Sequence, residues 1–336
     1  MNLVRAELER LSARRFVQLM VVLLVLAFAV TAATTLAGSH KPSVSELNSA
    51  RQQATEARQS MEATFRACLA RQNDTTPTVP DEYFPNDCSD IDPVLQDRLP
   101  IAADFLPGVF TFAEQAQPLL YFLVAFLVLF GFLVGASYIG ADLTSGGVVN
   151  LLLWRPRRVT VLAAKLGTLL GTVLVLALLA SVAYLATFWV IGQAAGLPGR
   201  LDGDFWRSLG AVHGRGLVLV LLASALGFAI ATLGRHTSAA LGAFAAYAVV
   251  WELGARLVLE IVDARKSDLF MLSSHIGAWL NGGARFYDER LCTGSTGLNC
   301  DAFYTITWQA SLLVLLVLAG GLTAAAFAVF RRRDLI

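Results

Sequence analysis

The sequence predicts an all-α membrane protein that crosses the bilayer six times. Apolar residues make up 56% of the 336-residue chain, and only 15% of its residues are charged. The mean hydropathy of +0.61 excludes an ordinary water-soluble protein. Crossing a bilayer as a helix takes about 20 apolar residues. Runs of sufficient length cover residues 16–36, 119–139, 159–190, 216–233, 239–262 and 306–330.

The charge distribution predicts how these spans are oriented. Six spans put both chain termini on one side of the membrane. If that side is the cytoplasm, the inner segments hold 12 Lys or Arg and four acids. The outer segments then hold 13 Lys or Arg and 19 acids. Basic residues concentrate in cytoplasmic segments. We therefore expect cytoplasmic termini in a multi-pass protein of the bacterial cell (inner) membrane.

The first 15 residues place Leu3, Val4, Leu8 and Leu11 at helical spacing, with charges between them. This pattern favours an amphipathic helix on the inner membrane surface, although an ordinary charged lead-in to a span would fit it equally well. The apolar core that follows is about 20 residues long, more than the 7–15 of a cleaved signal peptide. We therefore expect residues 16–37 to be the first transmembrane helix.

Residues 38–118 form the largest segment predicted outside the membrane, and we expect a mainly helical domain. It opens with a capping box, Ser43 followed by Glu46. Small or apolar residues then recur every three or four positions, which predicts one helix. These residues form a narrow stripe along one face of the helix, the seam. The seam suits a neighbouring helix, such as its own copy in a second subunit. A structural lid and a site of substrate capture both fit this domain.

All four cysteines lie in predicted outer segments, at Cys68, Cys88, Cys292 and Cys300. An even number of cysteines on the oxidising side of a membrane indicates disulfides. Three connectivities are possible. We favour the local pairs, Cys68–Cys88 and Cys292–Cys300, because they close the shortest loops.

The fifth span carries two charged residues, Glu252 and Arg256. A charge at the centre of a bilayer costs on the order of 2.5–3.5 kcal/mol. Residues four apart on a helix share a face, so the sequence predicts an ion pair between them. This pair could lock span five to its neighbours, or take part in gating or in the translocation route.

Residues 263–305 form the last predicted outer segment. A short apolar helix is expected around residues 269–280, which include Trp279, followed by a glycine-rich loop. We expect this helix to be re-entrant, dipping into the outer leaflet where surrounding protein buries it.

The inner segment between spans two and three combines an acid, two glycines, an apolar patch and a basic, proline-stopped end. It reads GADLTSGGVVNLLLWRPRRVTVLAAK over residues 140–165. Pro156 disfavours a helical conformation at the residue before it, which predicts a short amphipathic helix ending there. Such a helix at the membrane edge is suited to receive force from a soluble partner.

Several enzymatic motifs are absent from the sequence. It has no GxxxxGK[ST] phosphate loop, no HExxH and no GxSxG. Its four histidines are spread over both predicted faces, so we expect no metal site. We therefore expect this chain not to be an enzyme, and to bind no cofactor of its own.

The inner segment resembles that of permease subunits of ATP-binding-cassette type-2 exporters. The resemblance rests on Asp142, Gly147, the leucines 151–153, Pro156 with Arg157 or Arg158, and Lys165. The family usually has glutamate in place of Asp142. The six spans and the basic N-terminus also match, whereas residues 38–117 are much longer than the family's usual first outer loop.

The resemblance implies that residues 140–158 dock onto a soluble ATPase. The coupling residues are then Asp142, Gly147, Asn150, Leu151, Trp154, Arg155, Pro156, Arg157, Arg158 and Lys165. Separate ATPase subunits would bind ATP and Mg, and a second permease chain, identical or paralogous, would pair with this one among membrane lipids. The substrate would be a hydrophobic or amphipathic drug, lipid or peptide; no nucleic acid is expected. The alternative is a membrane sensor or scaffold whose outer domain binds a ligand or partner.

Overall fold

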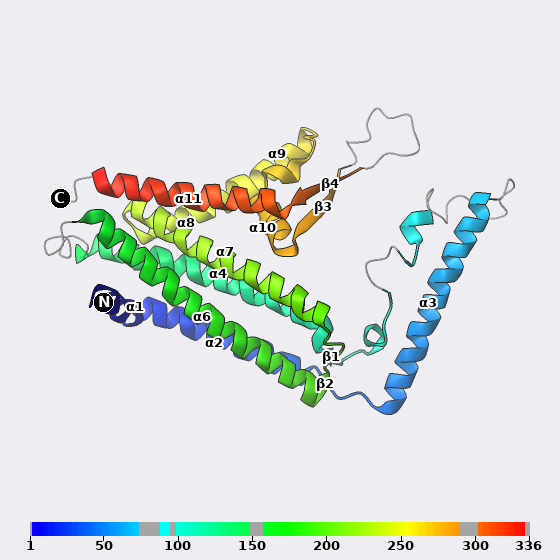
Figure 1. Cartoon of the computed structure of the whole chain (residues 1–336). Helices are drawn as coiled ribbons and strands as arrows, with labels where there is room; N and C mark the ends of the chain where they lie inside the picture. Colours follow the sequence, from blue (N-terminus) through cyan, green and yellow to red (C-terminus); the bar gives the residue numbers. More distant parts are fainter. Residues whose placement is uncertain (1, 74–87, 95–98, 148–156, 289–301, 333–336) are drawn as a thin grey trace. The chain divides into compact units, whose positions relative to one another are not determined.

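The computed structural model describes residues 2–73, 88–94, 99–147, 157–288 and 302–332, and most of these are helical (Figure 1). Within these ranges, six helices are long and apolar enough to cross a membrane. They are α2 (Arg15–Ala37), α4 (Phe112–Thr144), α6 (Arg158–Ala195), α7 (Gly203–Gly234), the helix Thr237–Ile261, and α11 (Trp308–Arg332). The predicted all-α, six-span membrane architecture is confirmed.

The fifth span changes its helical geometry along its length. It begins as α8 (Thr237–Ala246), continues as a π-helical stretch (Tyr247–Ala255) and ends as α9 (Arg256–Ile261). A π-helix forms i→i+5 hydrogen bonds, so residues five apart lie closer together than they do in an α-helix. This change decides which side chains share a face in span five.

The chain divides into two compact units, which are described separately. The first contains residues 1–29, 116–186 and 202–336, and therefore most of the transmembrane helices. The second contains residues 30–115 and 187–201, and therefore most of the predicted outer domain.

Helices α4 and α7 pack very closely within the first unit. Gly131 and Gly135 stand four residues apart on α4, the spacing that lets two membrane helices approach backbone to backbone. A Cβ atom added to Gly135 would lie 2.3 Å from the backbone oxygen of Ser224 on α7. On the other side, a Cβ added to Gly227 would lie 2.2 Å from the backbone oxygen of Phe132. Glycine is required at this contact because no side chain fits.

The second unit is built on the long helix α3 (Val44–Asn73). The predicted capping box is present: the Ser43 backbone N–H donates to Glu46 Oε2 at 2.6 Å, and the Glu46 N–H donates to Ser43 Oγ at 3.3 Å. The Ser43 backbone hydrogen bond, followed by that of its hydroxyl, lowers the pKa of the Glu46 carboxyl. The helix therefore begins where the sequence predicts.

The seam of α3 is covered in part by a later segment of the same chain. Ala50 packs in a small core with Leu106 and Val109, which follow the 3₁₀ turn η3 (Ala102–Phe105). At the far end, Cys68 forms the predicted disulfide with Cys88, the first residue of the turn η2 (Cys88–Ile91). Strands β1 (Phe110–Thr111) and β2 (Gly196–Leu197) pair in parallel in this unit. Cys292 and Cys300 lie outside the described residues.

The last outer segment contains the expected short helix and an unexpected hairpin. Helix α10 (Leu272–Asn281) is followed by β3 (Gly283–Tyr287) and β4 (Phe303–Thr307), which pair antiparallel from Gly283↔Thr307 to Tyr287↔Phe303. We expected only helix and loop here, and placed residues 306–307 in the last span. The aromatic and β-branched run Phe-Tyr-Thr-Ile-Thr is typical of a strand and could have revealed β4. Insertion of α10 into the outer leaflet stays a prediction.

Candidate functional site

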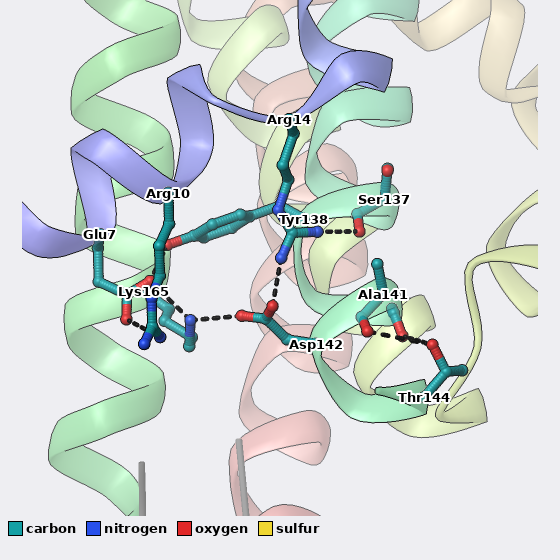
Figure 2. Close-up of polar contacts among 10 residues, drawn as sticks. Glu7, Arg10, Arg14, Ser137, Tyr138, Ala141, Asp142, Thr144 and Lys165 are labelled. Atoms are coloured by element: carbon teal, nitrogen blue, oxygen red, sulfur yellow. Dashed lines mark hydrogen bonds and ion pairs between the residues drawn. The ribbon is translucent and has the colours of Figure 1, made fainter. Parts of the chain in front are cut away.

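A buried cluster of charged side chains joins three helices at the end of the first unit where α1 (Asn2–Ser12) lies (Figure 2). Lys165, in the second turn of α6, is at its centre and is 1% exposed. Its Nζ lies 2.6 Å from Glu7 Oε2 of α1 and 2.6 Å from Asp142 Oδ2 of α4. One ammonium group therefore holds a carboxylate from each neighbouring helix.

Asp142 is bound by a second cation, Arg14, at the break between α1 and α2. The Arg14 Nη2 atom donates to Asp142 Oδ1, and its Nη1 donates to the backbone oxygen of Ser137 at 3.0 Å (Figure 2). Arg14 is positioned because the chain breaks its helix after Ser12 and restarts at Arg15. The carboxylate of Asp142 is thus held between α6 and the start of the first span.

Glu7 is as deeply buried as Lys165, with 1% exposure. Besides the ammonium, its carboxylate accepts a hydrogen bond from the hydroxyl of Tyr138 and lies 3.5 Å from Arg10 Nη1. The fully buried ring of Tyr138 also contacts two cations, with Arg14 Cζ at 5.2 Å and Lys165 Nζ at 4.9 Å from the ring centroid. Tyr138 therefore contacts groups of both signs of charge within the cluster.

The pairing in this cluster is what makes its burial tolerable. A buried charge is very unfavourable unless it is paired and hydrogen-bonded, and removing one partner of a buried pair costs about 3–5 kcal/mol. Here two carboxylates, Glu7 and Asp142, meet three cations, of which Arg10 is half exposed. Each carboxylate is neutralised by neighbours, which suits a rigid joint better than proton transfer.

The cluster holds together the two ends of the predicted coupling segment. Asp142 lies in the last turn of α4 and Lys165 in the second turn of α6, so their contact joins the two ends of the segment between them. The left-handed Gly146 (φ 73°) turns the chain just after α4, and Gly147 follows it. Arg158 is the first residue of α6, and Arg157 precedes it. Asn150, Leu151, Trp154, Arg155 and Pro156 lie outside the described residues.

Four members of the cluster were missed by the sequence analysis: Glu7, Arg10, Arg14 and Tyr138. A signal for Glu7 exists, since it stands three residues after Val4 and four before Leu11, and thus on the apolar face of α1. An acid on an apolar face needs a buried cation. Tyr138 precedes Asp142 by one helical turn, which is a much weaker signal. Helix α1 itself was expected, and its placement on the inner membrane surface stays a prediction.

The expected ion pair between Glu252 and Arg256 is wrong. Glu252 Oε2 accepts from the Tyr247 hydroxyl at 2.7 Å, and its Oε1 accepts from the Ser273 N–H at 2.9 Å. Arg256 is exposed, and its Nη2 lies 3.8 Å from Asp268 Oδ1. Glu252 lies in the π-helical stretch, whose i→i+5 bonding brings it closer to the residue five positions earlier, Tyr247, than an α-helix would.

Comparison with known proteins agrees with this architecture. A family model described as ABC-2 family transporter protein matches residues 1–335. The match includes residues 38–117, which the motifs of the inner segment leave out. No curated protein matches the chain.

Proposed function

Since the chain belongs to the ABC-2 family of transporter proteins, we propose that it is the permease subunit of an ATP-driven exporter. The family supplies the membrane component of ATP-binding-cassette transport. In our proposal, soluble ATPase subunits dock below residues 140–158, bind ATP and Mg, and drive the spans. The resident charges of this chain position helices; the hydrolytic chemistry belongs to the partner.

The observation that supports this proposal best is the ion pair between Asp142 and Lys165, which joins the two ends of the coupling segment. A force on the segment between them would be delivered to α4 and α6 together, because a buried 2.6 Å ion pair ties the two helices at that point. Arg14 adds the start of α2 through the same carboxylate. A force applied from the cytoplasmic side would therefore move α2, α4 and α6 as one group.

Helix α1 belongs to the same group because Glu7 shares the ammonium of Lys165. Its Leu11 is buried and its Leu8 is 41% exposed. This division fits a helix that packs on the protein with one side and meets lipid with the other. We propose that α1 follows the inner ends of the spans during the transport cycle.

The substrate, direction and pairing follow the family resemblance. We propose that a hydrophobic or amphipathic substrate (a drug, lipid or peptide) leaves the cytoplasm or the inner leaflet. A second permease chain, identical or paralogous, would complete the pathway. The apolar character of the spans supports a substrate of this kind, since a charged solute would need polar groups along its route.

Copurification from the native membrane tests the proposal. The tagged chain should bring down a soluble ATPase, and its rate of ATP hydrolysis should differ between the free ATPase and the complex. Trp154→Glu should abolish copurification, because it places a charge in the apolar patch of the docking segment. Asp142→Asn should retain the ATPase but reduce the effect of the permease on hydrolysis, because it weakens the contact with Lys165 that joins the two ends of the segment.

Asp204→Asn is the matched control, since Asp204 is an exposed residue near the start of α7. It should behave as the wild type in both measurements. An intact wild-type protein that binds no ATPase, yet keeps its cellular role, would favour the sensor or scaffold instead. Identical behaviour of Trp154→Glu, Asp142→Asn and Asp204→Asn would contradict the assignment of the coupling segment.

A further inference from the structure

The second unit contains a cavity beside the last turn of α2. Its volume is about 320 Å³, at the lower end of the roughly 300–1,000 Å³ of small-molecule sites. Thr34 and Thr35, from that last turn, line it together with Ser39 just beyond the helix. Most of the remaining wall comes from residues 103–110. All the residues that line the cavity belong to this one unit.

Hydrogen bonds hold the walls of the cavity in place. Ser39 Oγ donates to the backbone oxygen of Ala195 and accepts the Phe110 N–H at 2.9 Å. The His40 N–H donates to the backbone oxygen of Gly108 at 3.1 Å. The chain that leaves α2 is therefore joined to the segment that enters β1. A site with walls fixed before binding pays a smaller entropy cost when a ligand binds.

The hydroxyl groups that line the cavity have already donated their hydrogens. Thr34 Oγ1 donates to the backbone oxygen of Val30 at 2.9 Å, and Thr35 Oγ1 donates to that of Thr31 at 2.8 Å. The hydrogen of Ser39 Oγ is likewise used in its bond to a backbone oxygen. A hydroxyl oxygen has two lone pairs besides its one hydrogen. Towards a ligand, these three groups can therefore act only as acceptors.

The lining of the cavity is also uncharged. Among the described residues that line it, none is ionisable, so an ammonium group would find no carboxylate to neutralise it there. Leu106 and Val109 add apolar surface, and Gln115 adds a side-chain amide. The matching ligand is neutral, donates hydrogen bonds through hydroxyl groups and carries C–H groups between them. Sugars and glycerol have this chemistry.

We propose that this cavity binds the neutral, hydroxyl-rich headgroup of a lipid in the outer leaflet. The charge distribution assigns this end of α2 to the outside. Thr34 and Thr35 lie within one turn of that end, where the hydrocarbon layer gives way to headgroups. The acyl chains of a lipid hold its headgroup at this depth, an advantage that a free sugar lacks. The inference goes beyond the proposed function, and binding is measured on the permease chain alone.

Native mass spectrometry of the purified full-length protein, in a detergent without sugar, tests the site. The probes are glucosyl diacylglycerol and phosphatidylcholine with the same acyl chains, because the choline headgroup has no hydroxyl or amine hydrogen to donate. The wild type should bind the glucosyl lipid at least about tenfold more tightly. Thr34→Val together with Thr35→Val should remove this preference, because valine keeps the shape of threonine but has no acceptor.

Thr55→Val together with Thr64→Val is the matched control. These exposed threonines of α3 make the same bond to the backbone oxygen four residues earlier, at 2.9 and 2.8 Å. The control protein should keep the preference of the wild type. Ala103→Leu fills the cavity from another segment and should also remove the preference. It tests the same cavity if the variant with both α2 threonines replaced fails to fold.

Equal affinity of the wild type for the two lipids would overturn the site. The same preference in the α2 double variant and the α3 double variant would overturn it too. Methyl glucoside, which has no acyl chains, separates the two sources of this chemistry. At a concentration equal to that of the glucosyl lipid it should leave the lipid bound. Displacement at that concentration would overturn the lipid and assign the cavity to a soluble sugar.

The lipid site and the proposed function can fail separately. Copurification measures docking of an ATPase on the cytoplasmic side, whereas lipid binding needs neither the ATPase nor ATP. Loss of ATPase binding therefore leaves the lipid prediction intact. Normal ATPase coupling without any lipid preference would remove only the lipid site.

Discussion

The ammonium group of Lys165 binds two carboxylates that lie 158 and 23 residues away in the sequence. Each contact ties a different helix to α6, and Lys165 and Glu7 are each 1% exposed. Removing a single charge therefore leaves a buried partner unpaired. The strength of the joint is a property of individual side chains.

Glu7→Gln should loosen α1. The amide can still accept the Tyr138 hydrogen bond, but it no longer neutralises Lys165. A loss of about 3 kcal/mol is expected for one partner of a buried pair. Hydrogen exchange of the backbone amides in residues 2–12 should then accelerate roughly 100-fold, if α1 exchanges by detaching from the bundle.

Glu9→Gln serves as its control because Glu9 is 70% exposed and pairs only with Arg5 at 3.2 Å among the contacts described for it. Such surface pairs contribute little to stability. Equal exchange rates in Glu7→Gln and Glu9→Gln would show that the cluster does not hold α1.

Between helices, stability in this protein depends on how closely backbones approach. The α4–α7 contact leaves no room for a Cβ atom at Gly135, whereas nothing lies within 4 Å of a Cβ atom built on Gly171 of α6. The same substitution should therefore have opposite effects on two helices of the same bundle.

Gly135→Ala should lower the melting temperature of the purified protein in detergent, because α4 and α7 must move apart, at a cost of about 1–3 kcal/mol or more. Gly171→Ala should leave it unchanged or raise it slightly, since alanine favours a helix by roughly 1 kcal/mol over glycine. Thermal unfolding followed by tryptophan fluorescence measures both. A Gly135→Ala protein as stable as Gly171→Ala would mean that the two helices are not in close contact.

At the scale of the whole molecule, the two compact units hold themselves together by different means. The unit with most of the spans relies on close helix packing and buried charge pairs. The second unit has a small core around Ala50, Leu106 and Val109, and a disulfide that joins the far end of α3 to the following turn. Damage to that disulfide should therefore remain local.

Replacing both Cys68 and Cys88 by serine should destabilise the second unit by about 3 kcal/mol, as expected for a closed loop of this length, 20 residues. Trypsin should then cleave faster at Arg66 and Arg71 of α3, while the protection of residues 116–186 is retained. A simultaneous loss of protection in both units would show that they unfold as one.

Several features of the protein are determined by short stretches of sequence. The six spans are visible because each needs only its own run of about 20 apolar residues. The start of α3 follows from Ser43 and Glu46, three residues apart, and the Cys68–Cys88 disulfide closes a short loop. The inner segment also pointed to the family that the comparison identified.

Other features were decided only by the tertiary structure. Glu7 finds Lys165 across 158 residues, and no local pattern specifies which cation an acid on α1 will meet. Glu252 was expected to bind Arg256, but it binds Tyr247 and the start of α10 instead. The physical reason is common to both cases: apolar length is a property of one segment, whereas a buried charge takes whichever partner the packing of several helices brings within reach.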